Sequence, residues 1–283
     1  MKLAVIGDEV SQDLSEVIRL AKKHHFEGIE IRSVWGKNPL ELTRADCDRI
    51  VSELVAAGLK IAGFATPTFK TELPSNRSEI AMAQGILERS LTRAEWLRAP
   101  FVRTFSFYRQ GEPDPLAAAE VMGAVLNNMG QVPIPLAIET GTRSNTPNAE
   151  TMRALIGTLK YPRAGVLWDP GNGIFSGWEL SPCPQAYDLL RPYLLHVHVK
   201  DPLDQECYTE LGRGVVPWSA ILRQLHLDGF QGYASLETHW RIGRVLSNEE
   251  RDSPHGYGFS AGGHNASDRC MRVLRSLSEM ARV

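Results

Sequence analysis

The stretch GVLWDPGNGIFSGWELSPCPQAYDLLRPYLLHVHVKD, residues 165–201, begins and ends with a short apolar run. The first run, Gly165–Asp169, and the second, Leu194–Lys200, have the length and composition of buried β-strands. Their starts lie 29 residues apart, which leaves room for a crossover helix between two parallel strands. The stretch therefore predicts one strand–helix–strand unit.

The same spacing recurs along the whole chain of 283 residues. Apolar runs bounded by polar or glycine-rich turns start 25 to 41 residues apart, about one strand–helix unit each time. This repetition predicts parallel strands joined by crossover helices. The eight expected strands are Leu3–Gly7, Gly28–Ser33, Lys60–Ala65, Phe101–Phe107, Pro135–Thr140, Gly165–Asp169, Leu194–Lys200 and Tyr233–His239.

The segments between these runs have helical periodicity. Asp13–Lys23 places Leu14 and Val17 on one face, and Arg44–Ala57 repeats the pattern. The longest such segment is Arg77–Ala99. Strands and helices therefore alternate along the chain, which is typical of an α/β protein.

A closed barrel fits this pattern better than an open, doubly wound sheet. No GxGxxG fingerprint follows the first strand, and Gly7-Asp8-Glu9 is too acidic to bind a pyrophosphate. A (β/α)8 TIM barrel needs roughly 250 residues, and no Pro/Ser-rich linker divides this chain. We therefore predict a single-domain TIM barrel over residues 1–283, with a loop over the barrel mouth at 241–265 and a final helix at 266–281.

The composition excludes several classes of function. The 31 basic and 33 acidic residues give a net charge of −2, and no run of basic residues indicates a nucleic-acid partner. No apolar stretch approaches the ~18 residues of a membrane span, and no signal peptide precedes the first strand. The four scattered cysteines are typical of reduced thiols. We expect a cytoplasmic protein that binds neither nucleic acid nor membranes. The sequence is compatible with a homo-oligomer.

Each of the last four strands ends in a residue that can bind a metal ion. In a TIM barrel the active site lies at the carboxyl ends of the strands. Side chains alternate along a strand, so an outward Ile138, Val197 and Leu236 would leave their polar neighbours facing the barrel axis. The residues at these strand ends are Glu139, Asp169, His198 and Glu237.

Buried, unpaired carboxylates are costly, whereas carboxylates around a cation are tolerated. Three carboxylates and an imidazole suit manganese, magnesium, cobalt or zinc. Each residue alone also has a structural explanation: Asp169 as a helix cap, Glu237 paired with an arginine, and His196 or His198 as a hydrogen-bonded core imidazole. The four together favour a site for one divalent metal ion.

Five segments resemble the xylose isomerase-like barrel superfamily, the group of sugar (phosphate) isomerases and epimerases. They are IET at Glu139, WDPGN at Asp169, HVHVKD around His198, GRGVVPW at Gly212–Trp218 and SLETHW at Glu237. The resemblance implies a metal site made of Glu139, Asp169, His198 and Glu237, with manganese as the first choice. It selects His198 over His196, because His198 directly precedes Val199-Lys200-Asp201.

The resemblance also implies a reaction. Glu139 and Glu237 would serve as an acid/base pair on either side of one carbon, next to a cation that stabilises an enediolate. We therefore expect a metal-dependent isomerase or epimerase of a small ketose or related sugar derivative. A lyase of the same fold is the alternative, acting on an inosose, a dehydroshikimate-like keto acid or a C-glycoside, because these reactions start with the same enolisation.

Two further alternatives are less favoured. The DNA-repair endonuclease branch of the superfamily has a histidine where this chain has Asn172, so an apurinic endonuclease-like hydrolase with several metal ions is not expected. A non-catalytic barrel would bind no stoichiometric metal.

Other polar residues are candidates for contacts with a sugar or keto-polyol substrate. Arg32 and Arg103 are expected at the barrel mouth, paired with Glu30 or with ligands. Because Gly212-Arg213-Gly214 is the only loop that resembles an anion site, a phosphate on the substrate is not expected. Tryptophans near strand ends would stack on a sugar or pack beneath loops; these are Trp168, Trp178, Trp218 and Trp240. The candidate substrate contacts are Lys200, Arg213, His239, His196 and Asn172.

Overall fold

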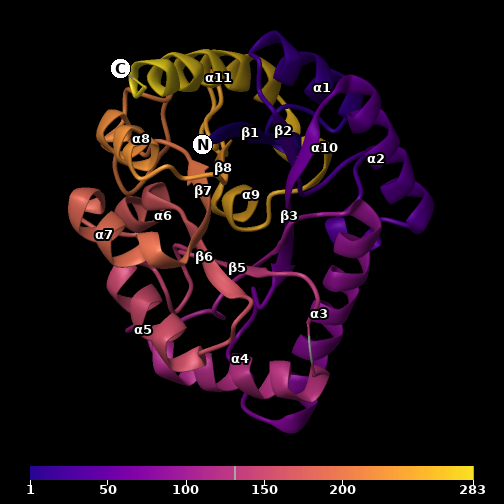
Figure 1. Cartoon of the computed structure of the whole chain (residues 1–283), viewed down its shortest axis with the longest axis vertical. Coiled ribbons are helices and arrows are strands. Elements are labelled where there is room, and N and C mark those ends of the chain that lie inside the picture. Colours follow the sequence, from indigo (N-terminus) through magenta and orange to yellow (C-terminus); the bar gives the residue numbers. More distant parts are fainter. Residues whose placement is uncertain (131, 283) are drawn as a thin grey trace.

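The computed structural model describes residues 1–130 and 132–282. Eight parallel strands pair in chain order and close into a barrel inside a ring of helices (Figure 1), which confirms the predicted (β/α)8 fold. The strands are β1 (Lys2–Ile6), β2 (Gly28–Ile31), β3 (Lys60–Thr68), β4 (Val102–Thr104), β5 (Leu136–Glu139), β6 (Ala164–Trp168), β7 (Leu194–Val199) and β8 (Tyr233–Leu236).

Most of the helices cover the outside of the barrel. The Arg44–Ala57 helix has its predicted bounds, and Asp13 caps the first helix by accepting a hydrogen bond from the Ser15 amide. The helices are α1 (Leu14–Lys23), α2 (Arg44–Ala57), α3 (Arg77–Leu97), α4 (Pro115–Met129), α5 (Ala149–Leu159), α6 (Pro170–Phe175), α7 (Tyr187–Leu190), α8 (Trp218–Leu227), α9 (Asn248–Asp252), α10 (Gly256–Ser260) and α11 (Gly263–Met280).

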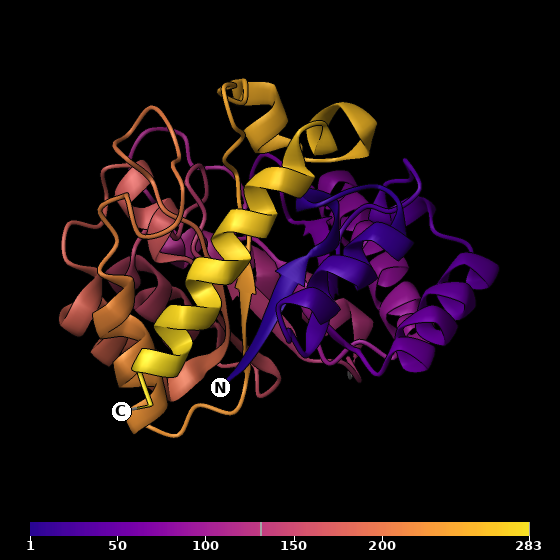
Figure 2. The same ribbon diagram turned by 90° about the horizontal axis from the view of Figure 1, so that it is seen from above.

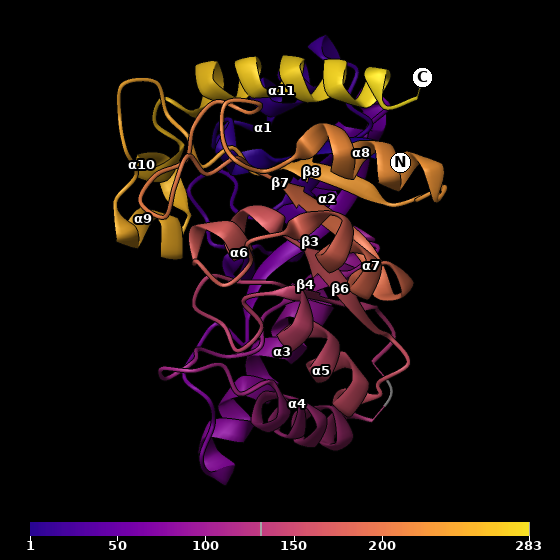
Figure 3. The same cartoon turned by 90° about the vertical axis from the view of Figure 1, so that its left-hand side faces the viewer.

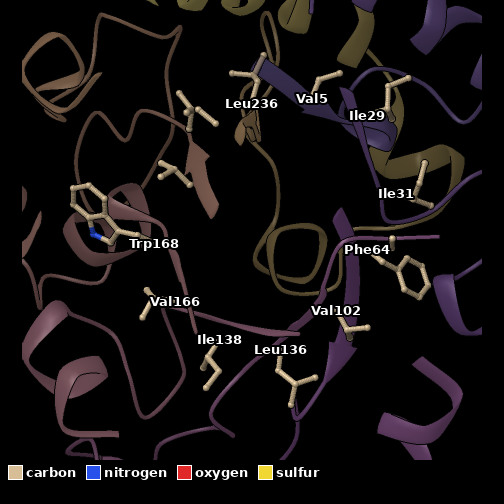
Figure 4. Packing of buried hydrophobic residues seen from close by; sticks show 14 of the residues in the cluster. Val5, Ile29, Ile31, Phe64, Val102, Leu136, Ile138, Val166, Trp168 and Leu236 are labelled. Carbon is tan, nitrogen blue, oxygen red and sulfur yellow. The ribbon is translucent and has the colours of Figure 1, made fainter. Parts of the chain in front are cut away.

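The predicted alternation of side chains holds in the barrel. Branched and aromatic strand residues such as Ile29, Ile138 and Leu236 point outward into the layer between strands and helices (Figure 4). A separate small cluster of Phe101, Ala137 and Leu167 fills the inside. The buried acidic residues Glu139 and Glu237 lie at or just beyond the carboxyl ends of β5 and β8.

The segment 241–265 differs from the predicted loop. It contains α9 and α10, and the final helix α11 begins at Gly263 rather than at residue 266. The side chain of Ser247 accepts from the Glu250 amide and that of Glu250 accepts from the Ser247 amide, a capping box that starts α9. Figures 2 and 3 show α9 and α10 at the end of the barrel opposite both chain termini, so the segment does cover the mouth.

Strand β4 is shorter than the predicted Phe101–Phe107. Beyond Thr104 the amides of Phe105 and Phe107 still donate to carbonyls of Thr68 and Phe69, but regular strand pairing ends, and Phe107 has a left-handed conformation with a φ of 58°. Among the described residues, no helix is both long and apolar enough to cross a membrane.

Candidate active site

A cavity of about 550 Å³ opens at the carboxyl end of the barrel. Residues of α9 and of the loops after β3 to β8 line it, which is the usual place for a TIM-barrel active site. Six of the residues predicted from the sequence lie on its wall: Arg103, Glu139, Asn172, Lys200, Glu237 and His239.

The four predicted metal ligands converge beside this cavity, and all four are buried. The Nδ1 atom of His198 lies 3.4 Å from Glu139 Oε1 and 3.5 Å from Glu237 Oε2. It also lies 3.8 Å from Asp169 Oδ2. Two ligands that each lie about 2.1 Å from one ion are about 3.0 to 3.4 Å apart, so these separations are close to those that a shared cation requires.

His198 is held so that one ring nitrogen faces these carboxylates. Its Nε2 atom lies 3.1 Å from Glu30 Oε1, and Nδ1 has no hydrogen-bond partner among the described residues. A neutral ring that donates from Nε2 to Glu30 presents the Nδ1 lone pair to three carboxylates, which is unfavourable unless a proton or a cation lies between them. A carboxylate behind the ring is the usual support of a metal-binding histidine.

Sequence reasoning missed this role of Glu30. The same carboxylate lies 2.9 Å from Nε2 of His196, so it joins both histidines of β7 to β2. Glu30 could have been found from alternation, because Ile29 and Ile31 point outward and leave Glu30 facing the axis.

Asp169 combines a structural role with a place in the cluster. Its Oδ1 atom accepts a 2.9 Å hydrogen bond from the Asn172 amide and so caps α6, whereas Oδ2 faces His198. The side chain of Asn172 donates to Glu139 Oε1 at 3.1 Å, which fixes that carboxylate. Between them, Gly171 allows close packing, since a Cβ there would lie 2.7 Å from Cγ of Lys200.

Three cations contact the carboxylates, two arginines through the outer oxygens and Lys200 through oxygens that face His198. Arg103 Nη1 lies 3.2 Å from Glu139 Oε2, and Arg32 Nη1 donates to Glu237 Oε1 at 2.6 Å. The ammonium of Lys200 lies between Asp169 and Glu237, 2.7 Å from Asp169 Oδ2, and also donates to Glu237. Both arginines reach the barrel mouth as predicted, but they pair with other carboxylates, because the histidines of β7 occupy Glu30.

Arg32 belongs to a wider network of buried ion pairs. It also binds Asp8 and Glu9 in the loop after β1, and Glu9 in turn contacts His239 and Arg241. Within the described residues, this network has six carboxylates and four cations, an excess of two negative charges when the histidines are neutral. The carboxylates are Asp8, Glu9, Glu30, Glu139, Asp169 and Glu237, and the cations are Arg32, Arg103, Lys200 and Arg241. One divalent cation would neutralise the network, and the residues present therefore fit such an ion.

The pKa shifts show how the network accommodates this excess charge without a metal ion. Burial, with Glu237 and Glu139 adding to it against Lys200, raises the pKa of Asp169 to about 7. Burial lowers the pKa of His198, but Glu30 and Glu139 outweigh it and hold that pKa well above its usual value. A proton on Asp169 removes one negative charge, and a second proton on the His198 ring adds one positive charge. Together they offset the excess of two negative charges.

We expect manganese to bind more tightly as the pH rises. Folding raises the pKa of Asp169 from 3.8 to about 7, so the metal-free protein loses this contribution to stability as the pH rises through that range. Below pH 7 the metal must displace this proton, which lowers its affinity by about tenfold per pH unit. Manganese should therefore raise the melting temperature more at pH 8 than at pH 6, as scanning fluorimetry can measure. An equal increase at both pH values would contradict this assignment.

Two predicted contacts lie elsewhere. His196 lies beneath the cavity, where it contacts Glu30 and Ser235. The side chain of Arg213 is 74% exposed and pairs with Glu210. The loop around Arg213 does gather backbone amides, but those of residues 212, 214 and 216 all donate to the carboxylate of Asp201, so its anion site is already filled from within the chain.

Of the two alternatives for the tryptophans, the cavity does not support stacking on a sugar. None of the four tryptophans proposed from the sequence is among its lining residues, and Trp168 packs on Tyr187 outside the barrel. Phe175 and Tyr208 supply aromatic surface instead, stacked with 4.7 Å between their ring centroids.

Comparison with known proteins supports the fold and identifies the family. No curated protein sequence matches the chain. A structure of L-ribulose 3-epimerase superposes with a TM-score of 0.77 at 15% identity, covering 99% of this chain and 95% of that one. D-psicose 3-epimerase from Clostridium cellulolyticum H10 gives a TM-score of 0.75 at 14% identity, covering 100% and 99%.

A probable 3-DHS dehydratase from Bacillus anthracis, involved in petrobactin synthesis, gives a TM-score of 0.69 at 18% identity and covers 98% of both chains. At these identities the likeness shows the fold, which epimerases and a dehydratase share. The family model described as a xylose isomerase-like TIM barrel matches residues 18–261. The chain therefore belongs to the xylose isomerase-like TIM barrel family.

Proposed function

We propose that this protein is a metal-dependent isomerase or epimerase of a small ketose or a related sugar derivative. Its metal ligands would be Glu139, Asp169, His198 and Glu237, and its acid/base residues Glu139 and Glu237. The structural neighbours that are epimerases support an enzyme of this type.

One observation carries the proposal. Glu139 and Glu237 both line the cavity, and they approach the same nitrogen of His198, at 3.4 and 3.5 Å. They come from β5 and from the end of β8, so they reach the cavity from different sides. A carbon bound between them has a carboxylate available on either face, and removal of a proton on one face with return on the other inverts that carbon.

Both carboxylates are in the ionised form that a base requires at neutral pH. Burial raises the pKa of each, but Arg103 and then His198 bring that of Glu139 down to about 2. Lys200 and then His239 hold the pKa of Glu237 well below its usual value. Both are therefore ionised when the substrate enters. The carboxylate that removes the α-proton becomes protonated, and inversion requires that the opposite carboxylate takes a proton from solvent and delivers it to the other face.

A divalent cation supplies polarisation of the substrate carbonyl and stabilisation of the negative charge that develops as the α-proton leaves. The chain contributes a second positive charge, the Lys200 ammonium, which lines the cavity beside Glu237. There it can donate a hydrogen bond to a substrate oxygen that gains negative charge. His239 lines the same wall with its Nδ1 atom 2.7 Å from Glu9, so its ring orientation is fixed for a substrate contact.

The function is tested by incubating the manganese-loaded protein with a panel of ketoses in D2O. We expect deuterium on the carbon next to the carbonyl of a recovered, isomeric sugar. Loss of water or of an aglycone would instead assign the lyase chemistry of the same fold. Absence of exchange and of elimination with ketoses, inososes and keto acids alike would contradict the proposal. The cytoplasmic location and a homo-oligomer stay predictions.

A further inference from the structure

The wall of the cavity carries more positive than negative charge. Among the described lining residues there are six cations and three carboxylates. The carboxylates are Glu139, Glu237 and Asp252, and the cations are Lys70, Arg103, Arg109, Arg143, Lys200 and Arg251. Such an excess attracts anions into a cleft.

Most of these cations have a partner within the chain. Arg103 pairs with Glu139, Lys200 with Asp169 and Glu237, and Arg143 with Asp252. Arg251 donates to the carbonyl of Glu206 and lies over the ring of Phe175, away from the cluster of acidic residues. These contacts account for four of the six cations without any ligand.

Lys70 has no such partner. Within residues 1–130 and 132–282 no carboxylate pairs with its ammonium, which lies 5.0 Å from the centroid of the Phe105 ring. The guanidinium of Arg103 lies 4.9 Å from the centroid of the same ring, and both residues line the cavity. Burial, followed by Arg103, lowers the pKa of Lys70 to about 8, which is typical of an ammonium without a counter-ion.

Arg109, like Arg251, has no ion-pair partner among the described residues. Its guanidinium donates to the Thr142 carbonyl and lies over the ring of Trp178, 5.5 Å from the centroid. Burial, followed by Arg143, lowers the pKa of Arg109, and the opposing effect of Glu112 does not outweigh them.

We propose that the substrate carries an anionic group, a carboxylate or a phosphate, which Lys70 binds at the side of the cavity formed by β3 and β4. This inference rests on the proposed function, since the sugar and its anionic group would occupy one cavity. The sequence predicts no phosphate on the substrate, because it offers only the Gly212-Arg213-Gly214 loop as an anion site. The amides of Gly212 and Gly214 bind Asp201, so the proposed anion site lies at Lys70 instead.

The position of Lys70 also orients the substrate. Arg103 contacts Glu139 through Nη1 and faces Phe105, and Lys70 lies over that same ring. The anionic group would thus lie beyond Arg103, whereas the reacting carbon lies between Glu139 and Glu237. A substrate with its charge at one end and its carbonyl near the other fits this arrangement.

The test uses three ligands with one carbon skeleton: D-fructose, D-fructuronate and D-fructose 6-phosphate. Binding to the manganese-loaded protein is measured by calorimetry, with inorganic phosphate as a competitor that has no sugar skeleton. We expect at least one of the two anions to bind roughly 10- to 100-fold more tightly than D-fructose, as charge-assisted hydrogen bonds allow. The anion that binds more tightly distinguishes a carboxylate from a phosphate.

Variants of Lys70 assign the preference to this side chain. Lys70→Met should lose most of the preference, Lys70→Arg should keep it, and Lys60→Met, a control at the exposed start of β3, should not change it. Equal affinity for the three sugars, no binding of either anion, or an undiminished preference in Lys70→Met would overturn the inference.

The same samples separate this inference from the proposed function. Deuterium exchange into D-fructose without any preference for anions would leave the proposed function standing and overturn the role of Lys70. A preference for anions that Lys70→Met removes, without exchange or elimination in any ligand of the wider panel, would support the anion site and contradict the proposed function.

Discussion

Replacement of Glu139 by glutamine should lower the rate of proton exchange into the substrate by about 10²- to 10⁴-fold, the range in which acid/base residues contribute. The amide keeps the shape of the side chain but cannot accept the proton. Glu139 is buried next to Arg103 and Asn172, so the change also leaves Arg103 without its carboxylate. Solvent deuterium incorporation, followed by NMR on each variant, measures the effect.

The same substitution at Glu237 should cause a loss of similar size, because each carboxylate serves one face of the reacting carbon. Bound metal has to be quantified in both variants, since an amide oxygen is a weaker ligand than a carboxylate. Glu210→Gln is a matched control: Glu210 is buried in the loop after β7 but does not line the cavity. Exchange at the wild-type rate in either Glu139→Gln or Glu237→Gln would remove that residue from the acid/base pair.

Replacement of Arg32 by methionine should destabilise the metal-free protein by about 3 to 5 kcal/mol, the cost of removing one partner of a buried ion pair. Arg32 is buried and donates to Asp8, Glu9 and Glu237. These partners belong to the loop after β1 and to the end of β8, so Arg32 joins the first and last strands where the barrel closes. Without Arg32, the buried carboxylates of Asp8, Glu9 and Glu237 lose a positively charged partner.

Urea unfolding followed by circular dichroism measures this change. Arg44→Met is the control, because the pair of Arg44 and Asp48 lies on the surface of α2 with side chains 64% and 56% exposed. Such a pair contributes at most about 1 kcal/mol. If Arg32→Met were no less stable than Arg44→Met, the buried network would not hold the two strands together.

The sequence predicts the strands well because each one is a buried apolar run bounded by a turn. Alternation then predicts which side chains face the axis, and Ile138 and Leu236 do pack outward against the helices. The convergence of Glu139, Asp169, His198 and Glu237 follows from parallel strands that end at the same rim. These features depend on local pattern, which a single sequence contains.

Other features depend on partners that are distant in the sequence. Alternation places Glu30 facing the axis, but its partners His196 and His198 lie more than 160 residues away, so the local pattern does not identify them. The exposure of Arg213 could not be predicted either, because Asp201 folds back to bind the amides of that loop. Lys70 follows a strand like many surface lysines, and only the folded cavity shows that it lacks a carboxylate partner.

A crystal structure of the manganese-loaded protein, with anomalous diffraction recorded for the metal, tests the central claim most directly. We predict one strong anomalous peak within about 2.3 Å of ligand atoms from Glu139, Asp169, His198 and Glu237. No peak among these side chains, or a peak only at the nearby group of Glu9, Glu237 and His239, would contradict the account.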